Sequence, residues 1–429
     1  MIHEISRCRI CGSSKLVPVL DLGKQILTGR FVRPGEPDPL GGPLELVLCY
    51  DPASPDACCG LLQLRHSYPL GEMYGRTYGY RSSNNATMVR HLQAKIQALV
   101  RLARPAAGDA VLDIGSNDGT TLRNYDGLGL RRFGCDPSSA KFVQEYPADV
   151  KLIVDFFSAA RLRREAGDLR FRIVTSIAMF YDLEDPFAFM QEVVSVLAPD
   201  GVWEFEQHYM PAMLERCAYD SVCHEHISYY SLRQIKWMTD RAGLKIIDLS
   251  TNDINGGSFA VVAALKDAPY PEATAKIDAM LASEAAMGLA TLGPFEKLAR
   301  DVAGHRTVLR AFLENARASG KRVVGCGAST KGNVILQYCG ITPRELPMIA
   351  EKYAIKYGLE TPGTRIPIVS EAQAYAERPD YLLVLPWYFR DDLIEREKVY
   401  LDAGGTLVFV LPNLEQVSRA TLRSAGASA

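Results

Sequence analysis

The chain has 429 residues, of which 48% are hydrophobic, 23% charged and 9% aromatic, and its formal net charge is −2. This length predicts roughly two to four domains, and the near-neutral charge without a long Lys/Arg run argues against electrostatic binding to nucleic acid or anionic membranes. The chain has no run of about 18 apolar residues, and its start MIHEISRCRICG lacks the apolar core of a signal peptide, so we expect a cytoplasmic protein.

Residues 1–75 are turn-rich and predict a small module that cannot bury enough core alone. CRICG at 8–12 is typical of a zinc knuckle, in which two thiolates lie on a tight turn. Tetrahedral zinc needs four ligands, and all-cysteine ligation leaves no open position, so the predicted zinc is structural. The alternative is a set of reduced, metal-free thiols. We assign as ligands Cys8, Cys11, Cys49 and Cys59, with Cys58 as the alternative to Cys59.

Residues 76–266 predict an α/β domain. A helical pattern over 87–103 leads to the apolar strand AVLDIG at 110–115, and strands and helices alternate from there. The first strand runs into a glycine turn in VLDIGSNDGTTL, and the second ends in an acid within FGCDPS. Small residues let a ligand approach the backbone, and an acid after the second strand can accept hydrogen bonds from ribose hydroxyls.

The glycine turn favours S-adenosylmethionine over a dinucleotide. The dinucleotide fingerprint G-x-G-x-x-G is absent, since the turn reads GSNDG, whereas DxGxxxG with a second-strand acid fits S-adenosylmethionine methyltransferases. The later VDFF adds a carboxylate and an aromatic face suited to an adenine. A glycine turn that holds no ligand is the alternative. The candidate cofactor residues are Asp113, Gly115, Asn117, Gly119, Asp136, Asp155 and Phe156.

Residues 267–318 are rich in Ala, Leu, Glu and Lys and predict a helical connector, after which residues 319–429 form a second α/β series. Within it, VVGCGASTKGNVIL at 323–336 predicts a strand, a loop and a helix start. The loop is neither a Walker loop nor a dinucleotide fingerprint, but its amides and Lys331 suit a phosphate. The alternative is a duplicated fold whose loop binds nothing.

The stretch DSVCHEHISYY at 220–230 places two of the seven histidines of the chain on either side of Glu225. A neutral histidine suits a base near pH 7. In an extended segment His224 and His226 share one face, so a metal pair is an alternative, although no third ligand is evident nearby. A merely structural pair is the other alternative.

Eight segments occur in order along nearly the whole chain: CRICGSSKLVPVLDLGKQILTGRF, CGLLQL, YGRTYGYRSSNNATMVRHL, LDIGSNDGTTL, HEHISYYSL, NGGSF, GCGASTKGN and GGTLVFVLP. Together they resemble the sugar C-methyltransferase family, which methylates carbon 3 of nucleotide-linked 4-keto-6-deoxyhexoses. The resemblance implies a zinc-binding domain, a central S-adenosylmethionine domain and a C-terminal Rossmann-like domain that helps to hold the sugar nucleotide. We expect a nucleotide-sugar substrate, no nucleic-acid or membrane partner, and a monomer or weak homo-oligomer.

The resemblance also implies roles for single residues. The second histidine of HEH in this family is the proposed base, which corresponds to His226, and Glu225 is placed to orient a sugar hydroxyl or the imidazole, with His224 beside them. Tyr78 and Tyr80 of TYGYRSS match a tyrosine-rich segment that could donate a hydrogen bond to an enolate oxygen, with core packing as the alternative. For the sugar nucleotide, the candidates are Ser329, Lys331, Asn333, Lys356 and Tyr357.

The chain departs from the family pattern in two places. TSIAMFYDLEDP at 175–186 lacks the Asn and His that other members carry after the fourth strand, and Cys223 stands where they often have a Tyr. The identity of the sugar and the acceptor atom therefore stay open. One alternative is O- or N-methylation of another carbohydrate precursor on the same scaffold. A second is a zinc-linked binding protein without catalysis.

Overall fold

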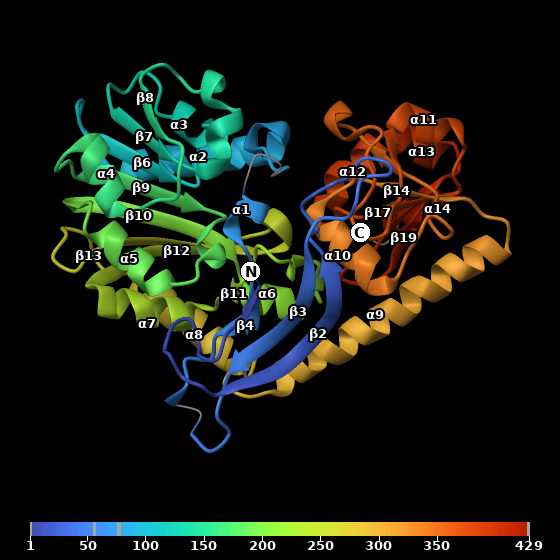
Figure 1. Ribbon diagram of the computed structural model, residues 1–429, viewed down its shortest axis with the longest axis horizontal. Helices are drawn as coiled ribbons and strands as arrows, with labels where there is room; N and C mark the ends of the chain where they lie inside the picture. Colours follow the sequence, from blue (N-terminus) through green and yellow to red (C-terminus); the bar gives the residue numbers. More distant parts are fainter. Residues whose placement is uncertain (1, 55–56, 75–78, 427–429) are drawn as a thin grey trace.

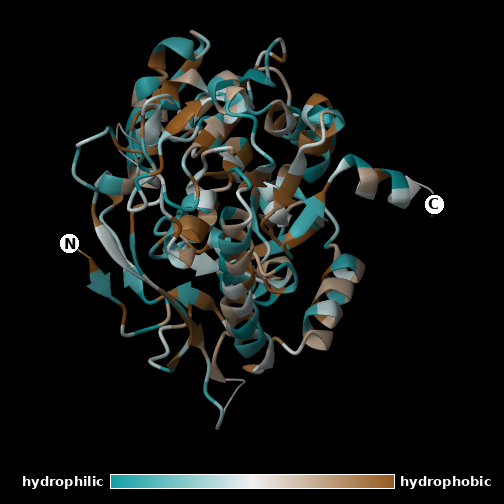
Figure 2. Cartoon of the chain, turned by 90° about the vertical axis from the view of Figure 1, so that its right-hand side faces the viewer, coloured by the Kyte–Doolittle hydropathy of each residue, from teal (hydrophilic) through white to brown (hydrophobic). Residues whose placement is uncertain are grey.

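The computed structural model describes residues 2–54, 57–74 and 79–426. Two α/β domains lie on either side of a small antiparallel sheet formed mainly by the N-terminal segment (Figure 1). Helices at the surface of the molecule carry both hydrophilic and hydrophobic residues (Figure 2). Among the described residues, no helix has both the length and the hydropathy needed to cross a membrane.

The N-terminal sheet has the order β11-β4-β3-β2, and a second, two-stranded sheet pairs β1 with β5. The bounds are β1 His3–Glu4, β2 Leu16–Ile26, β3 Gly41–Cys49, β4 Leu62–Leu64, β5 His66–Ser67 and β11 Ser228–Tyr229, with the short helix α1 Leu70–Met73. Strand β11 comes from the central domain and pairs antiparallel with β4. The apolar face of the β2–β3 hairpin shares one hydrophobic core with the C-terminal domain. The module thus completes its core with residues from both neighbours.

The central sheet has the order β12-β13-β10-β9-β6-β7-β8, in which β13 runs antiparallel between β10 and β12. Its strands are β6 Ala110–Ile114, β7 Arg131–Cys135, β8 Val150–Ile153, β9 Phe171–Ile177, β10 Leu197–His208, β12 Leu244–Asn252 and β13 Ser258–Leu265. Strands β6, β9 and β10 are almost wholly buried, as expected when helices cover both faces of a parallel sheet. The carboxyl ends of β6 to β10 therefore share one edge.

Helix α2 (Ala86–Ala103) is capped at its N-terminus by Asn85, whose side chain accepts hydrogen bonds from the amides of Thr87 and Met88. The apolar residues of this helix recur every three or four positions. The other helices are η2 Ser82–Asn84, α2 Ala86–Ala103, α3 Thr120–Arg123, η3 Pro137–Lys141, η4 Val143–Glu145, α4 Ala159–Ala166, η5 Phe180–Asp182, α5 Pro186–Val194, α6 Met210–Glu215, η6 Tyr219–Ser221, α7 Leu232–Ala242 and η7 Ile254–Gly256.

The predicted helical connector consists of α8 Thr274–Ala286, which packs on α7, and the long α9 Gly293–Ala318, which contacts β2 and β14. The C-terminal sheet has the order β16-β15-β14-β17-β18-β19, with only β19 antiparallel. Its strands are β14 Val323–Cys326, β15 Ile349–Glu351, β16 Ile368–Ser370, β17 Tyr381–Val384, β18 Thr406–Phe409 and β19 Glu415–Val417. Its helices are α10 Thr330–Cys339, η8 Ala354–Lys356, α11 Glu371–Ala376, η9 Trp387–Phe389, α12 Arg390–Arg396, α13 Lys398–Asp402 and α14 Arg419–Gly426. The predicted α/β class with a second Rossmann-like domain is confirmed.

Candidate active site and zinc centre

Four cysteine sulfurs gather at one end of the N-terminal sheet. They belong to Cys8, Cys11, Cys49 and Cys59 and all lie within 4.8 Å of one another. The Sγ atoms of Cys8 and Cys59 are 3.4 Å apart, and those of Cys11 and Cys49 are 3.5 Å apart. Tetrahedral zinc with Zn–S bonds of about 2.3 Å separates its sulfurs by about 3.8 Å, so these residues fit one zinc ion. The alternative ligand Cys58 instead contacts Ser13, with Sγ 3.7 Å from Oγ.

The cysteine cluster is connected to the backbone of the HEH segment. Arg9, between the first two cysteines, donates hydrogen bonds to the carbonyl of Leu64 at 2.6 Å and to Oγ of Ser67 at 2.7 Å. Leu64 ends β4, and its amide donates to the carbonyl of Ile227, the residue that follows His226. A metal bound at the cysteines would therefore hold in place the strand on which the HEH segment ends.

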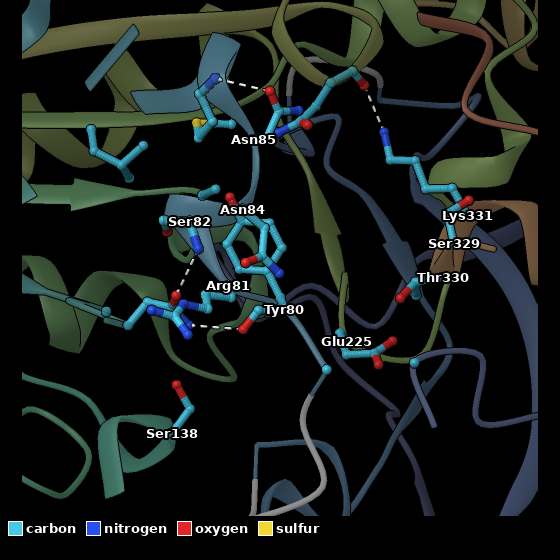
Figure 3. Close-up of a pocket in the computed structure, with 18 of the residues that line it drawn as sticks. Tyr80, Arg81, Ser82, Asn84, Asn85, Ser138, Glu225, Ser329, Thr330 and Lys331 are labelled. Atoms are coloured by element: carbon cyan, nitrogen blue, oxygen red, sulfur yellow. Dashed lines mark hydrogen bonds between the residues drawn. The ribbon is translucent and has the colours of Figure 1, made fainter. Parts of the chain in front are cut away.

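A cavity of about 810 Å³ lies between the two α/β domains. Ligand sites in proteins typically measure about 300–1,000 Å³. Both parallel sheets direct the carboxyl ends of their strands toward it, which is the edge where open α/β sheets bind ligands. Figure 3 shows Tyr80 and Ser138 on one side of this cavity and Glu225, Thr330 and Lys331 on the other.

The glycine turn after β6 forms one wall of the cavity. Gly115 and Gly119 have φ angles of +79° and +76°, a region that favours glycine. Asp113, buried at the end of β6, accepts a hydrogen bond from Oγ1 of Thr175 at 2.6 Å, while its Oδ2 has no hydrogen-bond partner among the described residues. Burial raises the pKa of Asp113 to about 7. An unpaired buried carboxylate that faces a cavity fits a ligand with a cationic group.

Asp136, after the second strand, fixes this turn. Its carboxylate accepts hydrogen bonds from the amide of Asn117 at 2.8 Å and from the amide of Ser138 at 2.6 Å. Two oxygens offer about four acceptor sites, so capacity remains for hydroxyls of a ligand. Phe156 also lines the cavity, with 42% of its surface exposed.

Two predicted cofactor residues do not line the cavity. Asp155 forms an ion pair with Arg161, and its carboxylate accepts a hydrogen bond from the amide of Phe156 at 2.7 Å. Gly119 lies under the ring of Tyr146, which a Cβ at this glycine would approach to 3.0 Å. The residues that do line the cavity are Asp113, Gly115, Asn117, Asp136 and Phe156.

His226 lines the opposite wall, and a backbone hydrogen bond fixes its tautomer. Its Nδ1 lies 3.0 Å from the carbonyl oxygen of Ser221, and because a carbonyl only accepts, Nδ1 carries the hydrogen. Nε2 is then left with an acceptor lone pair. The ring packs on Tyr181, with 4.2 Å between ring centroids. Burial, followed by the ammonium of Lys331, lowers the pKa of His226 to about 3, so the imidazole is neutral near pH 7.

The two histidines of HEH do not share a face. His224 is fully buried outside the cavity, edge-on to Tyr68 at 4.6 Å between ring centroids, and burial lowers its pKa to about 4. A His224–His226 metal pair is therefore not formed. Within the described part of the chain, the four cysteines make the only group of three or more side chains that could hold a metal.

Glu225 points into the cavity and is only 6% exposed, and its Oε2 has no hydrogen-bond partner within residues 2–54, 57–74 and 79–426. Burial raises its pKa. The position of Glu225 depends on Gly29, because a Cβ there would lie 2.7 Å from Oε1. Tyr80 also lines the cavity, with 44% of its surface exposed, whereas Tyr78 lies outside the described residues.

The sequence analysis missed three further residues that line the cavity: Tyr181, Asp182 and His208. Burial raises the pKa of Asp182 well above its usual value, and its Oδ1 has no hydrogen-bond partner in the part of the chain that the structure describes. His208 ends β10, 5.5 Å from His226 between ring centroids, and burial lowers its pKa. All three follow or end parallel strands at the edge of the sheet where α/β domains bind ligands. That position in the sequence was the signal by which they could have been predicted as site residues.

The C-terminal candidates divide into two groups. Ser329, Lys331 and Lys356 line the cavity, whereas Asn333 and Tyr357 do not. Asn333 donates to the carbonyl of Thr28 at 2.7 Å and so attaches α10 to the N-terminal segment. The hydroxyl of Tyr357, on the outer side, donates to the carbonyl of Lys352 at 3.1 Å.

Glu351 at the end of β15 is a further residue that the sequence analysis missed. Its carboxylate accepts hydrogen bonds from the amides of Ala328 at 3.1 Å and Tyr353 at 3.0 Å. Lys356 donates to the same carboxylate at 3.2 Å. This arrangement repeats the one at Asp136, where a second-strand acid holds the amide of the preceding glycine loop. The two domains thus present similar loops to one cavity.

Comparison with known proteins gives three family matches in chain order. They are a zinc binding domain over residues 8–74, a methyltransferase domain over 88–249 and a C-methyltransferase C-terminal domain over 253–412. The C-methyltransferase NovU of Streptomyces niveus is 30% identical over 429 residues, which cover 97% of this chain and 98% of that protein.

Solved structures of methyltransferases are similar to part of this chain. The 1,6-didemethyltoxoflavin-N1-methyltransferase of Burkholderia thailandensis, with bound 1,6-didemethyltoxoflavin and S-adenosylhomocysteine, is 16% identical over 43% of this chain and 80% of that chain, with a TM-score of 0.33. The glycopeptide N-methyltransferase MtfA with sinefungin is 17% identical over 40% of this chain and 93% of that chain, with a TM-score of 0.32.

The full-length match to NovU and the ordered domain matches agree with the cysteine cluster of the N-terminal module and with the glycine turn that lines the cavity. The chain therefore belongs to the C-methyltransferase family, as a methyltransferase that uses S-adenosylmethionine and has a structural zinc site.

Proposed function

We propose that the enzyme methylates carbon 3 of a nucleotide-linked 4-keto-6-deoxyhexose, through an enolate that forms when His226 removes the proton. The observation that carries this proposal is the tautomer of His226. Its Nδ1–H is bound to the carbonyl of Ser221, so its Nε2 lone pair is available in the cavity that the cofactor turn also lines. The similarity to NovU, a C-methyltransferase by name, supports a carbon acceptor.

The C–H bond beside a ketone is only weakly acidic, so the site needs a positioned base and a means of stabilising the enolate. When bound, S-adenosylmethionine supplies the electrophilic methyl group. His226 takes the proton at Nε2, and the Ser221 carbonyl then stabilises the imidazolium through Nδ1–H. Burial favours the protonated forms of Glu225 and Asp182, which can donate hydrogen bonds to sugar oxygens, and Tyr80 is a further donor.

We infer that the nucleotide is held by the C-terminal domain, residues 319–429. The glycine loop after β14 lines the cavity with Ser329. Glu351 accepts a hydrogen bond from the amide of Ala328 in this loop, and Lys356 donates one to the carbonyl of Ala328. The cofactor would then be bound by the central domain, residues 76–266. The connector, residues 267–318, would join the central domain to the C-terminal domain. The module of residues 1–75 would support the HEH strand through β4.

Asp136→Ala is expected to weaken S-adenosylhomocysteine binding by about 10–100-fold, because the carboxylate both holds the turn and offers acceptors to ribose hydroxyls. Asp155→Ala is the matched control, and we expect a change of less than about threefold, since its carboxylate pairs with Arg161 outside the cavity. Titration calorimetry of both variants measures their affinity for S-adenosylhomocysteine. If both variants lost the same affinity, Asp155 would also have to be a cofactor-binding residue.

The substrate class is tested by isotope exchange. In D₂O, the enzyme with a 4-keto-6-deoxyhexose nucleotide is expected to exchange the hydrogen at carbon 3 and, with S-adenosylmethionine, to place a methyl group there. NMR of the products from dTDP, GDP, UDP and CDP sugars reports both the exchange at carbon 3 and the position of the new methyl group. A methyl on oxygen or nitrogen without exchange would instead identify the other acceptor class, and neither exchange nor methylation across the panel would contradict the proposal.

A further inference from the structure

We propose that Gly29, Glu225 and Thr330 form a polar subsite that binds a free hydroxyl group of the hexose ring of the substrate, and that Gly29 and Thr330 are specificity-determining residues. The three residues lie in the three parts of the chain that match the zinc binding domain, the methyltransferase domain and the C-terminal domain. This inference rests on the proposed sugar-nucleotide substrate.

The space beside Gly29 is shared by the other two residues. A Cβ at Gly29 would lie 2.7 Å from Oε1 of Glu225 and 3.7 Å from Oγ1 of Thr330. All three residues line the cavity, and Figure 3 shows the side chains of Glu225 and Thr330 close to each other. Gly29 does not have a φ angle in the left-handed region that favours glycine. The reason for a glycine here is therefore the space beside Glu225, and not the backbone conformation.

Helix α10 holds the segment before this glycine in place. Thr330, Asn333 and Gln337 are separated by three and four residues, so they lie on one face of the helix. Asn333 donates a hydrogen bond to the carbonyl of Thr28 at 2.7 Å. Gln337 accepts one from the amide of Ile26 at 2.7 Å and donates one to the carbonyl of Ile26 at 3.0 Å. The face of α10 that fixes the N-terminal segment thus also presents Thr330 to the subsite.

The polar side chains of the subsite can bind a further group. Glu225 is 6% exposed, and its Oε2 has no hydrogen-bond partner among the described residues. A buried carboxyl oxygen without a partner costs free energy, which a ligand that supplies the hydrogen bond would recover. The N-cap of α10 is Ser329, whose Oγ accepts a hydrogen bond from the amide of Gly332 at 3.0 Å, so the hydroxyl of Thr330 does not serve as the cap. It can donate to a ligand and accept from it.

A neutral hydroxyl fits this subsite better than a phosphate. Burial raises the pKa of Glu225 and so favours its uncharged form, whereas an anionic phosphate beside a buried carboxyl group has no compensating cation in the subsite. In a nucleotide-linked 4-keto-6-deoxyhexose, carbon 1 carries the nucleotide, carbon 4 the ketone and carbon 5 the ring oxygen, and carbon 6 is a methyl group. The free hydroxyls are therefore those of carbons 2 and 3, at or beside the carbon that His226 deprotonates.

The test compares kcat/KM for three sugars on the nucleotide that the wild type uses: the parent 4-keto-6-deoxyhexose, its 2-deoxy analogue and its 3-deoxy analogue. The wild type is expected to prefer the parent over one analogue by about 10–100-fold, because that analogue leaves the buried carboxyl group of Glu225 unpaired. Thr330→Val keeps the shape of the side chain and is expected to reduce this preference by about 3–10-fold, the contribution of one hydrogen bond. Differences in intrinsic reactivity between the sugars are common to all variants, so the change in preference isolates the contact.

Gly29→Ala is expected to lower kcat/KM for the parent sugar by about 10–100-fold and to remove most of the preference, because the new Cβ displaces the carboxyl group of Glu225. Gly71→Ala is the matched control. Gly71 belongs to the same module, also has no left-handed φ angle, and a Cβ there would meet no atom within 4 Å. Both the activity and the preference are expected to stay at the wild-type level in Gly71→Ala. Zinc content and thermal stability of both variants show whether the protein has folded, and if Gly29→Ala does not fold, Thr330→Val with the three sugars decides alone.

Equal kcat/KM values of the wild type for all three sugars would overturn the subsite and leave the proposed function in place. An unchanged preference in Thr330→Val, or in a folded Gly29→Ala, would overturn it as well. If Thr330→Val raised KM equally for all three sugars, Thr330 would be a contact of the diphosphate, which also overturns the subsite. A wild type that methylates none of the sugars would contradict the proposed function itself, and the subsite with it.

Discussion

Replacing His226 with glutamine is expected to lower turnover by about 10²–10⁴-fold, the usual contribution of a positioned base, while S-adenosylmethionine binding stays almost unchanged. The imidazole is separate from the cofactor turn, which is formed by Asp113, Gly115 and Asp136. Glutamine keeps a polar side chain in the cavity but cannot accept a proton near pH 7. Single-turnover methylation and hydrogen exchange at carbon 3 are expected to fall together, since both need the proton removed.

His224→Gln is the matched control for His226→Gln. His224 lies outside the cavity against Tyr68, so its replacement is expected to lower thermal stability while turnover per folded enzyme stays within about tenfold of wild type. If both variants lost turnover equally and chelators abolished activity, a metal at HEH would have to be reconsidered. If His226→Gln kept near-normal turnover, the base would have to be another group of the cavity wall. The next candidates would be Glu225, Asp182 and His208.

Replacing Cys49 with serine is expected to abolish zinc binding and to unfold the N-terminal module. Structural zinc binding contributes about 10–16 kcal/mol in small zinc domains, and the module has little core of its own, since its hairpin completes a core shared with the C-terminal domain. Metal analysis of the wild type is expected to give one zinc per chain. Differential scanning calorimetry of Cys49→Ser is expected to show an early, separate transition, whereas S-adenosylhomocysteine affinity changes far less.

Cys58→Ser controls for the loss of a thiol beside the cluster. Cys58 neighbours the ligand Cys59 in the chain, but its sulfur contacts Ser13 and is not part of the four-sulfur group. This variant is expected to keep one zinc and the wild-type unfolding profile. Loss of zinc in Cys58→Ser with retention in Cys59→Ser would reverse the assignment of the fourth ligand, and a zinc-free wild type of full stability would contradict a structural role.

Local sequence patterns predicted most of the elements and the cofactor turn. The periodicity of residues 87–103 corresponds to α2 Ala86–Ala103, and the apolar run before the glycine turn corresponds to β6 Ala110–Ile114. Such features depend on near neighbours in the chain: an apolar face repeats at the period of its element, and a turn with positive φ at Gly115 requires glycine. The zinc knuckle is of the same kind, because Cys8 and Cys11 are three residues apart.

The α/β class, the four-cysteine module and the presence of a candidate base in HEH thus follow from the amino-acid sequence. Which of these groups meet in space follows from the three-dimensional fold. It turned His224 into the core and His226 toward the cavity, brought Cys59 rather than Cys58 to the cluster, and carried Lys331 across to Asn255. The physical reason is that these choices depend on the packing of strands and helices distant in the chain, which residue spacing does not encode.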